Sequence, residues 1–411
     1  MSTNKRKKTS NKYLMRRLAV LLIVIAVLIS VFFIFQKNNK SKDISKNDSD
    51  KVEVKEDPIK TYKASLIAGG DALIHGGIYK AAYNSETDTY EFSHMLSLIK
   101  DEIQQYDIKY YNQEVITDED KPYSGYPVFN APSEWRENMV NDIGFNLVSL
   151  ATNHSMDCGI ESAKKSAQWW ENQENVIATG MASSEEKSKE HKIMEANGIT
   201  YAMLAYTYGT NGIPVTEDYV VNLFDEEKAL NDIKEIRDKV DVLIVAMHWG
   251  EEYNTGISDI QKQQATFLGE NGVDIILGNH THCIEPWEWI DEDTICFYAF
   301  GNLISNQITA ETPRIRELGP VGLLGTLDIT KTVDTEKNTS TIKIDNIGAE
   351  IIYTYRYYDN ENGKYDYLIV PFSKMNSEYM SDYESVYEKF CNIVKTFDQS
   401  INIAPLPNNV V

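Results

Sequence analysis

The stretch Val242-Leu243-Ile244-Val245-Ala246-Met247-His248 is a continuous apolar run that ends in a histidine. A strand that is buried on both faces, as in a parallel sheet, has this kind of sequence. Three further apolar runs also precede good metal ligands: residues 65–68 before Asp71 and His75, residues 146–150 before Asn153 and His154, and residues 273–277 before His280 and His282. Ligands of open α/β sheets bind in a crevice outside the carboxyl ends of the strands, so these runs predict that the metal-ligating side chains that follow them lie together in one crevice.

Segments with a helical spacing of apolar residues alternate with these runs up to about residue 330. The expected helices cover residues 92–106, 135–143, 225–239 and 259–270. Alternation of strand and helix predicts an α/β fold with a largely parallel sheet. Beyond residue 330 the pattern changes to antiparallel strands, and the expected elements are strands over 341–358 and 365–370 and a final helix over 378–397.

The N-terminal region predicts a membrane anchor. Residues 18–35 carry no charge and one polar residue, Ser30, and such a helix is about 27 Å long, close to the thickness of a bilayer's hydrocarbon core. Residues 1–17 contain seven basic residues and no acid, which places the N-terminus in the cytoplasm. A cleaved signal peptide is the competing interpretation, but the apolar run is long for one and no small-residue cleavage site follows it.

These features together predict how the chain is organised. A cytoplasmic tail (1–17), a single transmembrane helix (18–35) and a flexible linker (36–60) precede a main domain over 61–330 and a β-rich C-terminal extension with a final helix over 331–411. The main domain is expected on the outer side of the cell membrane. The formal charge of the 411-residue chain is −22. Without the seven basic residues of the tail, 33 basic residues remain against 62 acidic ones, so the rest of the chain is strongly acidic and we expect no nucleic-acid binding.

The residues that follow the four runs suit a site for two divalent cations. Two such ions about 3.5–4 Å apart need a bridging oxygen and several terminal ligands. Asp71 and Glu114, the last residue of the segment Tyr111-Asn112-Gln113-Glu114, offer bridging carboxylates. The expected terminal ligands are His75, His248, His280, His282 and the amide oxygen of Asn153. Such ligands suit Mn, Fe, Zn or Mg, so the sequence leaves the identity of the metal open.

His154, beside Asn153, is expected to remain unligated and to act as general acid for a leaving group. Asp157 lies three residues further on and would fix the tautomer of the His154 ring. The competing interpretation is that these histidines are ordinary loop residues, but four runs with the same kind of ending argue against it. The four cysteines exclude a disulfide scaffold, although Cys158 and Cys283 both fall in the expected site loops and a bond between them is open.

Six motifs in order resemble those of the CapA, or PgsA-type, poly-γ-glutamate capsule synthesis family. They are Gly70-Asp71, Asn112-Gln113-Glu114, the segment 153–159 with its Asn-His-x-x-Asp-x-Gly pattern, His248-Trp249-Gly250-Glu251-Glu252-Tyr253, the segment 278–286 around His280 and His282, and the segment 301–307 that begins with Gly301-Asn302. The resemblance covers about residues 62–310. It implies a fold related to the calcineurin-like metallophosphoesterases, a four-layered sandwich of two mixed β-sheets flanked by helices, with bound divalent metal.

By this resemblance, the metal-ligand positions are Asp71, Glu114, Asn153, His248, His280 and His282, and His154 matches the catalytic histidine. His75 departs from the pattern, because it stands four residues after Asp71 where the phosphoesterase relatives have a histidine two residues after the aspartate. A substrate-facing role for His75 is therefore an alternative to ligation. Glu114 stands where those relatives usually carry Asp, and its longer side chain can still bridge two ions.

Two kinds of function follow. The first is an extracytoplasmic hydrolase with a dinuclear metal site that cleaves a phosphoester or amide-like bond in an envelope or capsule polymer. The second is a non-catalytic accessory in capsule synthesis or export, which retains the metal for folding or polymer contact. A sensor or adhesion module is a third and weaker alternative. Expected partners are the membrane, the polymer and membrane-bound capsule synthase subunits, and the sequence leaves open whether the site is an enzyme.

Overall fold

The computed structural model describes residues 58–407, which belong to one compact unit over Pro58–Val411. The predicted tail and transmembrane helix, and the linker up to residue 57, lie outside the described residues. Ile59 and Lys60, expected at the end of the linker, begin the first strand. In residues 58–407 there is no helix with the length and apolar character needed to cross a membrane.

The larger of two sheets has nine strands and mixed directions. Its main path in spatial order is β16 (Lys364–Pro371), β15 (Thr339–Asp359), β14 (Val321–Asp334), β1 (Ile59–Ala72), β4 (Ile108–Asn112), β5 (Leu147–Ser149) and β6 (Ile177–Thr179), with β13 (Asn302–Ile304) on β1 and β17 (Asn402–Ile403) on β15. Neighbouring strands from β1 to β6 are parallel, whereas β14, β15 and β16 pair antiparallel. Because β14 runs through residue 330, the sheet continues into the segment expected as a C-terminal extension.

The smaller sheet has six strands and is also mixed. Its order is β11 (Trp287–Trp289), β12 (Ile295–Phe297), β10 (Ile275–Asn279), β9 (Val242–His248), β8 (Ile199–Thr207) and β7 (Met194–Ala196). The four inner strands are parallel. The apolar run at 242–247 is thus confirmed as a buried parallel strand, and the run at 273–277 is confirmed from Ile275, where β10 begins. A separate hairpin pairs β2 (Tyr83–Asn84) with β3 (Thr89–Tyr90).

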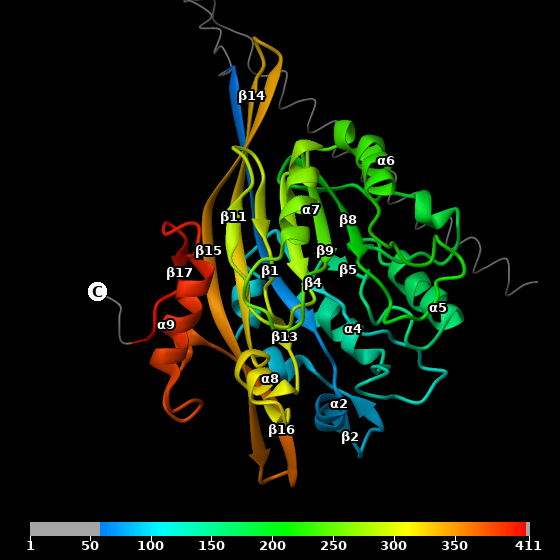
Figure 1. Ribbon diagram of the computed structural model, residues 1–411, viewed down its shortest axis with the longest axis vertical. Coiled ribbons are helices and arrows are strands. Elements are labelled where there is room, and N and C mark those ends of the chain that lie inside the picture. Colours follow the sequence, from blue (N-terminus) through cyan, green and yellow to red (C-terminus); the bar gives the residue numbers. More distant parts are fainter. Residues whose placement is uncertain (1–57, 408–411) are drawn as a thin grey trace, which may run out of the picture. The chain divides into compact units, whose positions relative to one another are not determined.

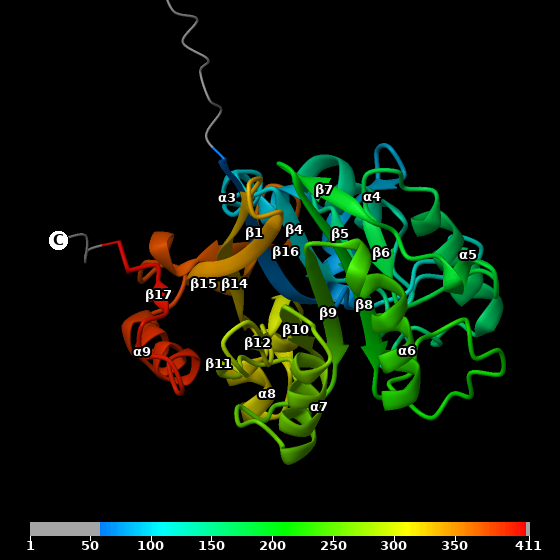
Figure 2. The same ribbon diagram turned by 90° about the horizontal axis from the view of Figure 1, so that it is seen from above.

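Helices cover the sheets, and the described α-helices are α2 (Gly76–Ala82), α3 (Lys100–Ile103), α4 (Glu134–Asn138), α5 (Ile160–Glu171), α6 (Glu226–Ile236), α7 (Asp259–Glu270), α8 (Pro313–Leu318) and α9 (Tyr383–Val394). Leu66 of β1 and Ile244 of β9 belong to one apolar cluster between the sheets. A second cluster joins Ile67 to α2, α3 and α4, and a third joins Leu243 to α6 and α7. Figures 1 and 2 show α6 and α7 on the face of the smaller sheet that is turned away from β1 and β4.

Two expected helices differ from the structure. The single helix predicted over 92–106 is wrong, because a 3-10 turn over Ser93–Leu96 precedes the one-turn helix α3. The backbone N–H of Phe92 donates to Asn138 Oδ1 at 2.9 Å. The apolar residues of the segment pack in one cluster with α4, so they are buried although the helix is not continuous. The segment predicted over 135–143 is helical, but it changes from α4 to a π-helix over Met139–Ile143.

Candidate metal centre

The carboxyl ends of the parallel strands of both sheets meet at one place. Asp71 of β1 is in register with Asn112 of β4, and Glu114 follows two residues later. In the smaller sheet, His248 of β9 is in register with Asn279 of β10, directly before His280. The predicted crevice therefore lies where the two sheets present their strand ends to each other.

Glycines allow this close approach of backbones. A Cβ atom added to Gly70 would lie 1.8 Å from the carbonyl oxygen of Gly301, and one added to Gly278 would lie 1.9 Å from the carbonyl oxygen of Tyr298. No side chain fits at such distances, so the backbones beside Asp71 and His280 pack directly on their neighbours.

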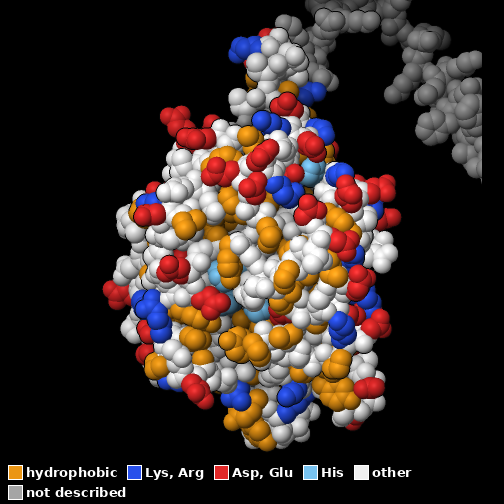
Figure 3. All heavy atoms as spheres, turned by 45° about the vertical axis from the view of Figure 1, so that its right-hand side comes forward, with side chains coloured by type: hydrophobic (Ala, Val, Ile, Leu, Met, Phe, Trp, Pro, Cys, Tyr) orange, Lys and Arg blue, Asp and Glu red, His pale blue; other side chains and the backbone are white. Residues whose placement is uncertain are grey.

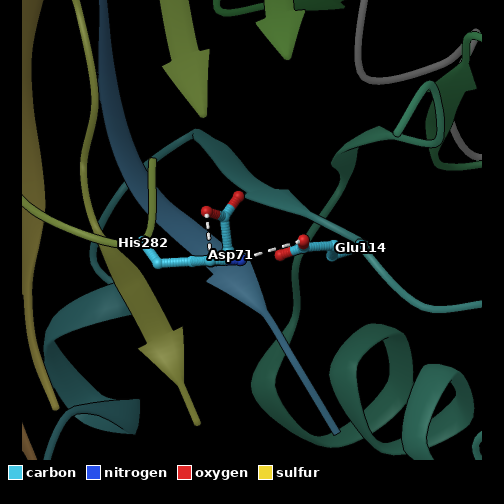
Figure 4. Close-up of side chains that lie close together, drawn as sticks. All are labelled: Asp71, Glu114 and His282. Carbon is cyan, nitrogen blue, oxygen red and sulfur yellow. Dashed lines mark ion pairs between the residues drawn. The ribbon is translucent and has the colours of Figure 1, made fainter. Parts of the chain in front are cut away.

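Asp71, Glu114 and His282 form the centre of the site (Figure 4). His282 Nδ1 is 3.3 Å from Asp71 Oδ2, and His282 Nε2 is 3.5 Å from Glu114 Oε1. One ligand atom from each residue lies within 4.8 Å of the others, and all three side chains are buried. This is the spacing at which three side chains can bind the same cation.

Three more of the predicted ligands adjoin this trio. His248 Nε2 is 3.9 Å from Glu114 Oε1 and 3.0 Å from Asn153 Oδ1. The backbone N–H of His280 donates to Asp71 Oδ2 at 3.1 Å, and the His280 and His248 rings are 4.8 Å apart. The structure therefore brings together Asp71, Glu114, Asn153, His248, His280 and His282, the six residues that the resemblance assigns to metal.

The donor atoms of this cluster fit a divalent cation. Both carboxylate oxygens of Glu114 and the Nδ1 atom of His280 are buried, and they have no hydrogen-bond partner within the described part of the chain. An unpaired buried polar group costs about 1–3 kcal/mol, and more when it is charged. His280 and His282 also adopt positive φ angles, 96° and 55°, a strained state for such side chains. A cation bound among these nitrogen and oxygen atoms would satisfy the unpaired groups.

Burial shifts the pKa values of the cluster in different directions. Burial raises the pKa of Glu114 well above its usual value, and it lowers the pKa of His280 to about 3. The pKa of His248 also falls well below its usual value because the ring is buried. For His282, burial acts to lower the pKa, but the charges of Glu114 and Asp71 outweigh it and raise the pKa to about 10. His248 and His280 are therefore neutral, and a cation must displace a proton from the Glu114–His282 pair.

Asn302 fixes the orientation of the His282 ring. Its Nδ2 donates to the carbonyl oxygen of Gly319 at 2.7 Å and to Gln307 Oε1 at 2.9 Å. A carbonyl oxygen only accepts, so the amide nitrogen must face it. The Oδ1 atom of Asn302 then faces His282 Nδ1 at 3.1 Å and accepts a hydrogen bond from its N–H group. This leaves Nε2 of His282 as the ligating atom beside Glu114.

Sequence reasoning assigned no role to Asn302 or to Asn112, whose Nδ2 donates to Asp71 Oδ1 at 2.8 Å. Both residues belong to the motifs quoted above, and this was the only indication in the sequence that they could contribute to the site. Their hydrogen-bond partners could not be predicted, because the direction in which each amide points depends on the fold.

His154 and His75 line a cavity next to the centre, with a volume of about 510 Å³. His154 Nδ1 is 2.8 Å from Asp157 Oδ2, which also accepts the backbone N–H of Phe129 at 2.7 Å. His154 Nε2 is thereby left as the nitrogen that can exchange a proton. His75 Nδ1 lies 3.0 Å from the carbonyl oxygen of Leu73, and burial lowers the pKa of His75 to about 4.

The structure thus places His75 on the cavity wall, outside the trio of Asp71, Glu114 and His282. All four cysteines are free. The Cys283 thiol contacts the carbonyl oxygen of Asn254, and the Cys158 thiol contacts that of Phe129. A Cys158–Cys283 disulfide is therefore not formed.

Comparisons with known proteins extend these observations. The model of the family described as bacterial capsule synthesis protein PGA_cap matches residues 65–307. The chain is 31% identical over 172 residues to the PGA biosynthesis protein CapA of Bacillus subtilis (strain 168), a match that covers 41% of the chain and 45% of that relative. It is 23% identical over 309 residues to the capsule biosynthesis protein CapA of Bacillus anthracis, covering 73% of the chain and 71% of that relative.

Two solved structures are also similar. One is a novel phosphatase from Mycoplasma pneumoniae, with a TM-score of 0.41 and 12% identity, covering 80% of this chain and all (100%) of that chain. The other is a hypothetical protein from Thermus thermophilus, with a TM-score of 0.38 and 12% identity, covering 68% of this chain and 98% of that chain.

Proposed function

The chain belongs to the bacterial capsule synthesis protein family PGA_cap, and from that premise we propose that it acts in poly-γ-glutamate capsule synthesis or export through a divalent-metal hydrolase site. The family membership is the one that the six motifs predict. We further propose that residues 18–35 anchor the chain in the cell membrane, with the main domain on the outer side. The basic tail and the uncharged run that follows it support this placement.

We also propose that the two sheets are the inner layers of a four-layered, metallophosphatase-like sandwich. The support is the distribution of apolar side chains: one cluster lies between the sheets, and a separate cluster joins each sheet to its own helices. This arrangement leaves the strand ends, rather than a sheet face, as the place for a site.

Asp71, Glu114, Asn153, His248, His280 and His282 are the residues proposed to hold two divalent ions. Such ions lower the pKa of water and polarise a carbonyl or phosphoryl group. His154 lines the substrate cavity. Asp157 accepts the hydrogen bond from Nδ1 and stabilises the charged imidazolium, from which Nε2 can donate a proton to the leaving group. The Phe129 amide keeps Asp157 in place, so the ring orientation is set before a substrate enters.

The observation that carries the proposal is the carboxylate of Glu114. It is 1% exposed, lies between His282 and His248, and has no hydrogen bond to any described residue. A protein that used this region only for packing would gain stability by replacing such a group, since a buried unpaired carboxyl is costly. Retention of the carboxylate among histidines is explained by a cation.

The test measures metal and turnover separately on the full chain. Purified protein is titrated with Mn²⁺ and Zn²⁺, and its metal content is determined by mass spectrometry. We expect at least one bound ion per chain, lost when His280 and His282 are both replaced by Ala and retained in His191→Ala, whose ring lies near Glu235. Absence of metal from the unmodified chain contradicts the proposal.

His154→Ala separates the two candidate functions. The hydrolase proposal predicts normal metal content and loss of turnover with aryl phosphate or γ-glutamyl anilide probes. The non-catalytic accessory would be favoured instead if His154→Ala supported polymer production at the level of the unmodified chain while the variant lacking both His280 and His282 did not. The close contact of His154 with Asp157 at the cavity is the observation that favours the hydrolase.

A further inference from the structure

The cavity beside the metal centre carries information about the substrate. Its lining includes the buried His282 and His154 together with the exposed Glu311 and the half-buried Ile315. Figure 3 shows histidine side chains at the surface of this side of the molecule, with hydrophobic and acidic side chains around them. A molecule held at the metal centre would therefore extend a substituent past these groups.

The charge of the cavity wall is negative. Glu252 and Glu311 line it, and the lining side chains among residues 58–407 include no Lys or Arg. Arg314 is a nearby cation, but it does not line the cavity, and its Nε donates to the carbonyl oxygen of Tyr253 at 2.6 Å. Anionic groups held beside Glu252 and Glu311 are consequently repelled by these carboxylates.

Aromatic rings supply the rest of the wall. Phe129 packs edge-on against His75 and His154, with ring centroids 5.3 and 4.7 Å apart. Tyr126, 78% exposed, lies 6.4 Å from Phe129, and the Tyr253 ring is 5.8 Å from that of His282. Aromatic faces together with carboxylates attract ammonium groups and tolerate neutral apolar ones.

We propose that this cavity binds the substituent of a substrate whose single anionic group lies at the metal centre, and that it selects an ammonium-bearing substituent over a neutral one and a neutral one over an anion. The inference rests on the proposed function, because the metal centre is what holds the anionic group. It implies that successive carboxylates of a polyanion such as poly-γ-glutamate do not occupy the cavity, so the bond cleaved at the metal centre is not an internal bond of that polymer. The expected substrates are then molecules with one anionic group at the metal centre and a cationic or uncharged substituent in the cavity.

Three non-hydrolysable probes test the ranking on the metal-loaded full chain. They are phenylphosphonate, 4-(aminomethyl)phenylphosphonate and 4-carboxyphenylphosphonate, which share one metal-seeking anion and differ in charge at the far end. Calorimetry is expected to give about fivefold tighter binding for the amine and about fivefold weaker binding for the carboxylate, each relative to phenylphosphonate. Equal affinities, or tightest binding of the carboxylate, would overturn the inference.

Paired variants assign the effect to the cavity. Replacing Glu252 and Glu311 together by Gln should reduce the ranking to within about twofold, whereas Glu251→Gln, which changes a neighbouring exposed carboxylate outside the cavity, should leave it intact. A ranking that survives the double variant also contradicts the inference. Metal uptake without probe binding or ranking refutes the inference alone, while failure of metal uptake refutes the proposed function and the inference with it.

Discussion

Replacement of Asn302 by Leu tests whether a neutral amide sets the chemistry of the metal centre. Leu has the same branched shape and the same number of side-chain heavy atoms, although its methyl groups are larger, so the change removes the hydrogen bonds and keeps the shape of the side chain. The Asn302 side chain lies 3.1 Å from His282 Nδ1 through Oδ1 and donates to Gly319 at 2.7 Å. Without it, His282 keeps only the Asp71 carboxylate, 3.3 Å away, to hold the proton on Nδ1.

The expected loss can be bounded from these contacts. Outer-sphere hydrogen bonds to a ligating histidine are worth about 10–100-fold in metal affinity, which corresponds to about 1.4–2.7 kcal/mol. The carbonyl oxygen of Gly319 loses one of its donors but retains Ser305 Oγ at 3.0 Å, so the added cost in folding stability should be about 1 kcal/mol.

Calorimetric titration with Mn²⁺ or Zn²⁺ measures the affinity, and ¹⁵N NMR of the histidine rings in the metal-loaded chain reports the tautomer of His282. Ser305→Ala is the matched control, because Ser305 contacts Asn302 and Gly319 but is not bonded to His282. The reasoning is refuted if Asn302→Leu folds and binds metal within twofold of the unmodified chain, or if Ser305→Ala weakens metal binding equally.

Three further predictions concern stability and metal. Burial raises the pKa of Glu285 to about 8, so the folded chain retains a proton that the unfolded chain releases near pH 4.5. The contribution of this group to the free energy of unfolding is therefore fully present below about pH 4.5 and falls by about 1.4 kcal/mol per pH unit up to about pH 8. Denaturant unfolding should show a flatter pH dependence for Glu285→Gln, and an unchanged slope would contradict this. Gly278→Ala should cost at least about 3 kcal/mol, because its Cβ would meet the Tyr298 carbonyl oxygen at 1.9 Å, whereas Gly209→Ala, with open space around it, should be nearly neutral in the same unfolding assay. Metal at about 100 times its dissociation constant should stabilise the chain by about 2.7 kcal/mol, seen as a higher melting temperature that His280→Ala abolishes; equal shifts in both proteins would place the ion elsewhere.

The sequence predicted the strands of the site better than the helices around it. A run such as 242–247 is apolar at every position, and its short length and β-branched residues favour a strand that is buried on both faces. Phe92, Met95, Leu96, Ile99 and Ile103 recur at helical spacing and are all buried. They nevertheless form a 3-10 turn and a single helical turn. Spacing reports which residues face the core, and the backbone path between them depends on partners such as Asn138 that are distant in sequence.

A similar limit applies to the site. Membership of the cluster follows from position, since any polar residue directly after a parallel strand must lie near the other strand ends. The role of each member depends on the position of its side-chain atoms to within about one or two ångströms, which the spacing of residues in the sequence does not specify. His75 and His282 illustrate this, because both are histidines after apolar strands, yet the His282 ring lies between two carboxylates while the His75 ring packs on Phe129 in the cavity wall. The amide of Asn302, which only the folded chain brings against His282, is what makes one of these two rings suited to bind a cation.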